Sequence, residues 1–159
     1  HTRYWRDWCS DVCSSDLSHG SPDGSAALRE HNRLGGSLRP SHLRDMLVGA
    51  GIRSRVVIVS ACFSGAFIAP LMDDNTIVLT AAAPDRTSFG CQPQNNWTFF
   101  GDALFNQNLR SGGSLVPAFD RAKVLIERWE REQNLSPPSN PQRHVGTRAA
   151  DLVRRAERR

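Results

Sequence analysis

The sequence has no long hydrophobic run. No stretch approaches the roughly 18 consecutive apolar residues that a membrane-spanning helix needs. The amino end also lacks the apolar segment that is typical of a secretory signal peptide. Hydrophobic residues make up 39% of the 159 residues, which is enough for one domain with a packed core.

Cysteine is scarce and is not arranged in metal-binding pairs. The four cysteines are Cys9, Cys13, Cys62 and Cys91, and only the first two lie close together in the sequence. Their C-x3-C spacing has no matching second pair, which argues against a zinc site, and four cysteines are too few for a disulfide framework. The chain also has no nucleotide-binding loop and no cluster of metal ligands, so we expect no cofactor.

The excess of positive charge is small and lies largely at the carboxyl end. The formal net charge is +4, and residues 154–159, RRAERR, carry much of it. No aromatic residue is interleaved with these arginines, which weakens the case for stacking on nucleic-acid bases. A basic helix end is usually a solvated face that suits the helix dipole, so we expect no nucleic-acid partner.

Residues 1–17 differ from the rest of the chain. The segment HTRYWRDWCSDVCSSDL has neither a helical nor a strand period. It resembles a translated sequencing adapter of the kind found at the ends of metagenomic reading frames, most closely in DVCSSDL. We therefore expect residues 1–17 to be artefactual or disordered, in a gene truncated at its amino end, and residues 18–159 to be the folded part. A genuine polar loop is the alternative.

From residue 18 onward, strand and helix signals alternate. After a polar loop at 18–25 we expect buried strands at 55–60 and 76–83, helices at 41–51, 64–71, 96–109, 114–133 and from 147 onward, and a loop at 136–142. Ser41 is the expected N-cap of the first helix, and the unbroken apolar run RVVIV predicts a strand buried on both faces. The alternation predicts an α/β fold with a parallel sheet covered by helices on both faces.

Cys62 follows the first predicted strand and precedes a turn of small residues. A packed thiol is the simplest interpretation, because free cysteine is among the most often buried residues. The alternative is a nucleophile at the carboxyl edge of the sheet, where open α/β sheets bind ligands. His19 and Gly20 favour the second interpretation, because an imidazole accepts the thiol proton and a glycine lets the backbone approach a substrate. If a strand precedes His19, both residues end parallel strands of one sheet.

The remaining candidate side chains carry weaker signals. Three other histidines lack a neighbouring glycine and are expected on the surface: His31, His42 and His144. Cys91 lies in the loop after the second predicted strand, where a packed thiol is the simpler interpretation.

Five segments of the chain together resemble a known family. They are SHGSPDG, SACFSG, TAAAPDRTSFGC, WTFFGDALF and SNPQ, and the His-Gly and Ala-Cys-x-Ser-Gly elements are specific as a pair. In this combination the chain resembles the bacterial legumain-like cysteine peptidases, family C13, of the caspase-like clan. The resemblance covers nearly all of residues 18–159. It implies a caspase-like three-layer αβα sandwich with a mostly parallel sheet, incomplete at its amino end, in which residues 18–159 form the carboxy-terminal portion of the catalytic domain.

The resemblance also implies a mechanism. Cys62 would attack the carbonyl carbon of the scissile peptide bond, and His19 would carry the proton to the leaving amine. The backbone N–H groups of Gly20 and Cys62 would form the oxyanion hole.

The same resemblance implies a pocket for the side chain of a substrate asparagine, lined by Ser60, Ser88 and Asp102. Asp102 matches a family carboxylate that would accept a hydrogen bond from a substrate amide, and a solvated helix carboxylate is the alternative. Ser60 departs from the animal and plant members, which have a glutamate there. The family's pocket arginine and the asparagine that orients the histidine belong to an amino-terminal part that this sequence lacks.

Three functions remain open from the sequence. The leading hypothesis is a cysteine endopeptidase that acts on peptide or protein substrates, with cleavage after Asn or Asp. The second is a transamidase of the GPI-anchor type, in which an amine replaces water as the acceptor. The third is a non-catalytic or inactive caspase-like fragment. An export signal or membrane anchor would lie in the missing amino-terminal part, so the compartment is open, and a periplasmic or membrane-associated parent is compatible with the sequence.

Overall fold

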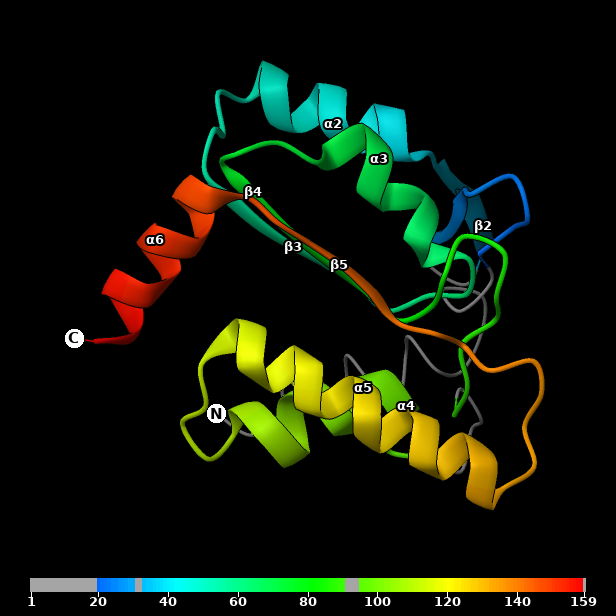
Figure 1. Ribbon diagram of the computed structural model, residues 1–159. Helices are drawn as coiled ribbons and strands as arrows, with labels where there is room; N and C mark the ends of the chain where they lie inside the picture. Colours follow the sequence, from blue (N-terminus) through cyan, green and yellow to red (C-terminus); the bar gives the residue numbers. More distant parts are fainter. Residues whose placement is uncertain (1–19, 31–32, 91–94, 159) are drawn as a thin grey trace.

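A computed structural model describes residues 20–30, 33–90 and 95–158 (Figure 1). The elements, in chain order, are β1 (Ala26–Glu30), β2 (Arg33–Leu38), α2 (Pro40–Gly49), β3 (Arg55–Val59), η1 (Ser64–Phe67), α3 (Ile68–Leu71), β4 (Thr76–Thr80), α4 (Phe99–Gly101), η2 (Asp102–Leu109), α5 (Leu115–Glu132), β5 (Gln142–Val145) and α6 (Thr147–Glu157). None of the helices in these ranges is long and apolar enough to cross a membrane.

The central sheet has β4 in the middle. Within the described residues its order is β3-β4-β5, with β3 parallel and β5 antiparallel to β4. Val57 lies beside Val78 in the first pairing, and Leu79 lies opposite Arg143 in the second. All five residues of β4 are buried, as expected for a strand with a neighbour on each side and helices on each face. Strands β1 and β2 form a separate antiparallel pair.

Helices cover both faces of the sheet (Figure 1). On one face α2 and α3 lie over the strands, and on the other face lie α4, η2 and α5. Because side chains alternate along a strand, Ile77 and Leu79 pack into the core with Phe119 of α5, whereas Val78 packs against Leu71 of α3. The predicted α/β class, with helices on both faces of the sheet, is thus confirmed.

Most of the predicted elements are present, with small shifts of their ends. The strands predicted at 55–60 and 76–83 are β3 and β4. The helix predicted at 64–71 is η1 followed by α3, and the one at 96–109 is α4 followed by η2. The helices predicted at 114–133 and from 147 onward are α5 and α6. Two features were not predicted, namely the β1–β2 hairpin and strand β5.

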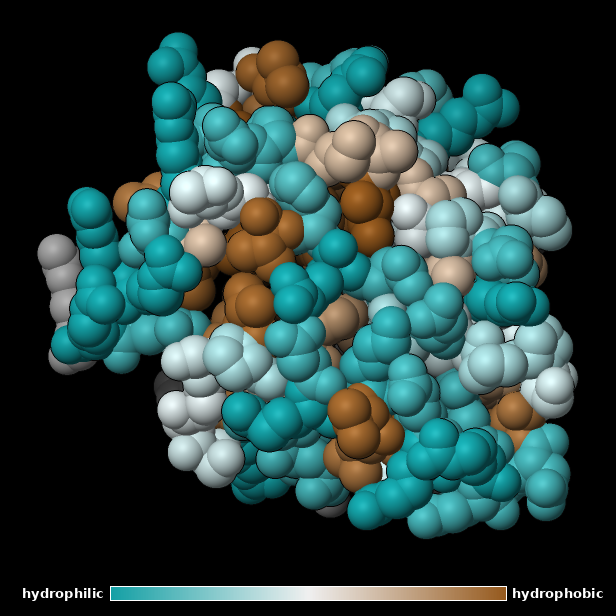
Figure 2. Space-filling view, in the orientation of Figure 1, coloured by the Kyte–Doolittle hydropathy of each residue, from teal (hydrophilic) through white to brown (hydrophobic). Residues whose placement is uncertain are grey.

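Two expectations about local structure are wrong. Arg39, not Ser41, is the N-cap of α2, because Pro40 occupies the first helical position, where its missing N–H costs nothing. Strand β3 is not buried on both faces: Val56 is 42% exposed, and within the described residues β3 pairs only with β4. Figure 2 shows the near face of the molecule, where hydrophobic residues are exposed among hydrophilic ones in front of the sheet, on the side on which β5 lies in Figure 1.

Candidate active site

Cys62 lies in the turn that follows β3, at the carboxyl end of the strand. The next residue, Phe63, has a φ of 57°, a left-handed conformation that is an outlier for a bulky side chain. Its N–H donates to the carbonyl oxygen of Arg86 at 2.7 Å, which holds the turn in place. Strand β3 ends at Val59, and Cys62 lies at the edge of the sheet in a turn whose backbone is strained at Phe63.

The sulfur of Cys62 is half-buried and contacts Ser88. The backbone N–H of Ser88 donates to Sγ at 3.3 Å, and the Ser88 hydroxyl oxygen lies 3.6 Å from it. The thiol in turn points to the Ser88 carbonyl oxygen at 3.8 Å. A backbone N–H donor therefore faces the sulfur atom. Of the predicted residues, Cys62 and Ser88 are therefore in direct contact.

Gly20 packs directly against the backbone of Cys62. A Cβ on Gly20 would lie 1.6 Å from the carbonyl oxygen of Cys62, so no side chain fits there. Gly20 is opposite Ala26 in an isolated antiparallel bridge, and the N–H of Ser21 donates to the Ser25 carbonyl oxygen at 2.8 Å. This pattern makes Gly20 and Ala26 a non-hydrogen-bonded pair, so the bridge does not use the N–H of Gly20.

His19 lies outside the described residues, as do residues 1–17, Cys91 and His31. The structure therefore describes the covalent neighbour of His19, which is Gly20, but not the imidazole.

The loop after Gly20 is held by local hydrogen bonds. The backbone N–H and the hydroxyl of Ser25 donate to Asp23 Oδ1 at 3.0 and 2.8 Å. These bonds, the backbone one first, hold the pKa of Asp23 below its ordinary value. Gly24 has a φ of 76°, and a Cβ there would lie 2.7 Å from the Cβ of Ala66. The loop thus rests on η1, the helix that follows Cys62.

The loop that carries Ser88 is fastened to the turn around Cys62. Ser64 Oγ accepts a hydrogen bond from the N–H of Ala82 at 3.1 Å, and both residues are buried. Gly65 permits close packing on Pro84, because a Cβ at Gly65 would lie 2.5 Å from Pro84 Cδ. These contacts fix the loops after β3 and β4 relative to each other, and so fix Ser88 relative to the sulfur.

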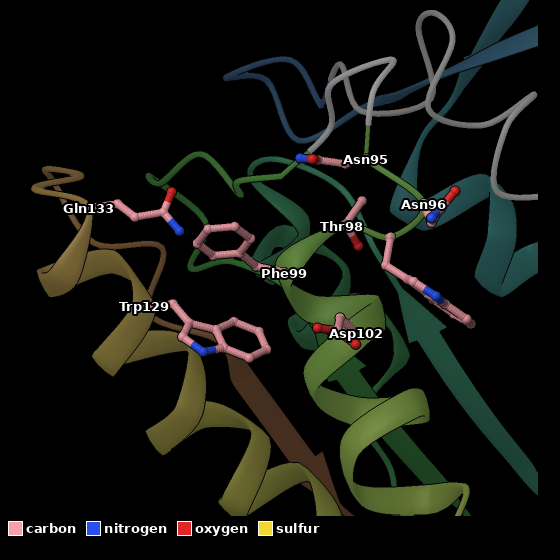
Figure 3. A pocket seen from close by; sticks show the side chains of 8 residues that line it. Asn95, Asn96, Thr98, Phe99, Asp102, Trp129 and Gln133 are labelled. Carbon is pink, nitrogen blue, oxygen red and sulfur yellow. The ribbon is translucent and has the colours of Figure 1, made fainter.

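A pocket lies at the start of α4 and η2 (Figure 3). Its volume is about 410 Å³, and it is lined by Asn95, Asn96, Trp97, Thr98, Phe99, Asp102, Trp129 and Gln133. Asp102 is the sole carboxylate among these eight residues, and none of them is a lysine or an arginine. The lining therefore combines one acidic group with neutral amides and aromatic rings.

Thr98 connects the other two predicted residues. Its Oγ1 lies 3.3 Å from the hydroxyl oxygen of Ser60, just after β3, and its carbonyl oxygen accepts from the N–H of Asp102 at 2.9 Å. The same Oγ1 caps α4 by accepting from the N–H of Gly101 at 3.0 Å. Ser60 and Asp102 are thus linked through Thr98, whereas within the described residues no hydrogen bond joins Asp102 to Cys62.

Of the eight residues that line this pocket, the sequence identified only Asp102, and two of the others, Thr98 and Trp129, make contacts that shape the site. Thr98 carried a usable signal, because a threonine three residues before the helical Gly101 fits an N-cap. Trp129 is one of the apolar residues at helical spacing on α5, a pattern that by itself indicates core packing. Its ring makes an edge-on contact with Phe99, with centroids 5.5 Å apart, and it also faces the pocket. Only the tertiary packing of α5 on α4 reveals this second role.

The other described candidates are not part of the site. His42 is exposed on α2. His144 lies on β5, where its Nε2 is 2.9 Å from the carbonyl oxygen of Asp73. In the part of the chain that the structure describes, no three His, Cys, Asp or Glu side chains gather closely enough to hold a metal ion.

The comparison with protein families decides the family. Residues 16–146 match the model of the peptidase C13 family, a range that runs from just before Gly20 to the end of β5. The chain belongs to the peptidase C13 family. Membership implies a hydrolase of the cysteine-peptidase kind, with protein or peptide substrates, and it confirms the resemblance found in the sequence and the caspase-like α/β class. A search of curated proteins gave no match.

Proposed function

We propose that this C13 chain is a cysteine endopeptidase in which Cys62 is the nucleophile and His19 its proton-transfer partner, both within a catalytic domain formed by residues 18–159. The packing of Gly20 on the Cys62 carbonyl is the observation that carries the proposal. Gly20 is the covalent neighbour of His19, so this packing supports the pairing of His19 with Cys62.

The reaction proceeds in two stages. The Cys62 thiolate attacks the carbonyl carbon of the scissile bond, a C–S bond forms, and the carbonyl oxygen becomes an oxyanion. His19 donates a proton to the leaving nitrogen as the C–N bond breaks, which releases the amine product and leaves a thioester. Water then attacks the thioester while His19 accepts its proton, and the acid product leaves with restoration of the thiolate.

The oxyanion is bound by the N–H groups of Gly20 and Cys62. Two observations support this assignment. The bridge to Ala26 leaves the N–H of Gly20 unused, and within the described residues the N–H of Cys62 donates to no protein acceptor. Loss of one such donor typically lowers the rate about 10²–10³-fold.

The pocket lined by Asp102 binds the side chain of the residue before the cleaved bond. Ser60, 3.3 Å from the pocket residue Thr98, and Ser88, beside the Cys62 sulfur, contribute to this binding. A carboxylate among neutral amides and aromatic rings favours a side chain that donates hydrogen bonds, which makes asparagine the preferred residue. An ionised aspartate would face Asp102 as a like charge, so cleavage after Asp is the weaker activity.

The test is hydrolysis of quenched fluorescent peptides that differ only in having Asn, Asp or Ala before the scissile bond. We expect the full chain to cleave the Asn peptide fastest, and we expect Cys62→Ser and His19→Ala to reduce turnover to background with unchanged circular dichroism. Turnover that survives Cys62→Ser would contradict the proposal. Adding a primary amine to the assay distinguishes a peptidase from a transamidase, because a transamidase converts the substrate to the amide of the added amine in place of the free acid.

A further inference from the structure

Helix η2 begins at Asp102 and is π-helical throughout. A π-helix forms hydrogen bonds between residues i and i+5. It is rare and is frequently found at functional sites. Its wider turn brings both the fourth and the fifth following residue near the first one. Asn106 and Gln107 occupy these positions, and both amide groups donate to Asp102 Oδ1, at 2.7 and 3.3 Å.

The two donors share one oxygen of the carboxylate. Within the described residues no hydrogen bond reaches Asp102 Oδ2, although a carboxylate oxygen accepts two bonds. Two amides on Oδ1 fix the rotation of the carboxylate about its last bond, and Asp102 lines the pocket (Figure 3). Oδ2 is therefore the oxygen left to accept a bond from a ligand.

Arg110 determines which way the Asn106 amide points. Its Nη1 donates to Asn106 Oδ1 at 3.1 Å, and a guanidinium donates but never accepts. The oxygen of the amide must therefore face Arg110, and its NH₂ must face Asp102. The residues Asp102, Asn106 and Arg110, spaced four apart, form one directed chain of hydrogen bonds along η2.

We propose that Asn106 is a positioning residue for substrate selection, which orients Asp102 so that Oδ2 accepts from an amide-bearing side chain before the scissile bond. Gln107 is the second donor, and Arg110 fixes the Asn106 amide. The inference rests on the proposed function, because it takes Asp102 as the carboxylate that contacts the substrate. It adds that selection for Asn depends on a residue that does not itself line the pocket.

The kinetic test uses full-length Asn106→Leu, which keeps the approximate volume and removes the donor. We expect kcat/KM for the Asn peptide to fall about tenfold, the size expected for a hydrogen bond to a charged group, while kcat/KM for the Ala peptide changes less than twofold. Asn108→Leu is the matched control. Asn108 lies on the same helix and donates to the Ala103 carbonyl oxygen at 2.7 Å, but it has no hydrogen bond to Asp102. We expect Asn108→Leu to leave the Asn-to-Ala ratio unchanged.

Asp102→Ala distinguishes failure of the positioning role of Asn106 from failure of the pocket assignment in the proposed function. If Asp102→Ala removes the preference for Asn and Asn106→Leu does not, the positioning role is wrong and the pocket assignment stands. If Asp102→Ala keeps the preference, the pocket assignment in the proposed function is wrong, and the inference is wrong with it.

A second measurement does not need activity. The side-chain NH₂ signals of Asn106 are identified in a ¹⁵N-labelled protein by their loss in Asn106→Leu. We expect them to shift in Asp102→Ala and to stay in place in Asn108→Leu. Signals that stay in place in Asp102→Ala would show that the hydrogen bond is not formed, and would overturn the proposal whatever the kinetics are.

Discussion

Gly20→Ala is the substitution that most sharply tests the close packing of Gly20 on Cys62. The added methyl group would lie 1.6 Å from the Cys62 carbonyl oxygen, and real Cβ contacts essentially never fall below 3.0 Å. The atom it meets belongs to the backbone and cannot rotate away as the end of a side chain does. The two backbones must therefore separate by more than about 1 Å.

Such a separation moves a proposed oxyanion donor away from the nucleophile. A misplacement of about 1 Å at a reacting centre costs roughly 10²-fold in rate, and loss of an oxyanion donor costs about 10²–10³-fold. Overpacking usually costs about 1–3 kcal/mol of stability, which leaves most well-packed domains folded. We therefore expect Gly20→Ala to lower kcat/KM at least about 10²-fold. This decrease is far larger than the loss of folded protein from its lower stability would cause.

The assay is hydrolysis of the Asn peptide, with thermal unfolding measured in parallel. Gly49→Ala is the control, because a Cβ at Gly49, in helix α2, meets nothing within 4 Å. Alanine favours a helix over glycine by about 1 kcal/mol, so the control should be equally active and slightly more stable. If Gly20→Ala keeps full activity, the reasoning from the close contact is refuted.

Three further predictions concern single side chains. Ser88→Ala should raise KM for the Asn peptide. It should change the rate at which iodoacetamide alkylates Cys62 less than about threefold, because the backbone N–H of residue 88 still donates to Sγ at 3.3 Å. A large decrease in the alkylation rate would contradict this. For Asp73, burial raises the pKa, but hydrogen bonds from Thr76, Asn75 and Arg55 outweigh it and hold the folded pKa below 3.8. As pH falls from about 5 to about 2, the unfolded chain therefore binds the proton before the folded chain does, and the free energy of unfolding decreases. Asp73→Asn should make the melting temperature depend less on pH over this interval. A variant whose melting temperature depends on pH as strongly as that of the unsubstituted protein would contradict this. Glu130→Ala should lower the free energy of unfolding, measured by urea denaturation, by about 1–3 kcal/mol, because the buried carboxyl group accepts hydrogen bonds from the backbone N–H and the hydroxyl of Ser139. An unchanged free energy of unfolding would show that the Glu130–Ser139 pair contributes nothing.

The main layers of the fold were predictable because their signals are local. β3 and β4 are short apolar runs bounded by polar residues, and α5 has an apolar stripe at helical spacing. Strand β5 has the sequence QRHV, which carries no strand pattern. It becomes a strand because β4 offers it an edge with unpaired backbone groups, and that is a property of the assembled sheet.

The hairpin of β1 and β2 escaped prediction for a related reason. Its second strand contains Gly35 and Gly36, which weaken a strand signal. The register also shifts between Leu28 and Arg29, so the pair has no regular alternation to detect.

The candidate site was partly predictable. Its parts follow strand ends, and the carboxyl edge of a sheet gathers such residues, as the contact between Cys62 and Ser88 shows. The π-helical winding of η2 was not predictable, because the apolar residues of FFGDALFNQNL fit an α-helix nearly as well. The bond from Gln107 to Asp102, five residues apart, follows from that winding.

The most direct test of the central claim is the reactivity of Cys62 in the folded chain. The protein is treated with a peptide that carries a thiol-reactive electrophile behind asparagine, and the adduct is located by mass spectrometry. We expect one adduct, at Cys62, that disappears in His19→Ala while the protein remains folded. A folded protein in which Cys62 reacts no faster than Cys91 would contradict it, and Cys62 would then be a packed thiol.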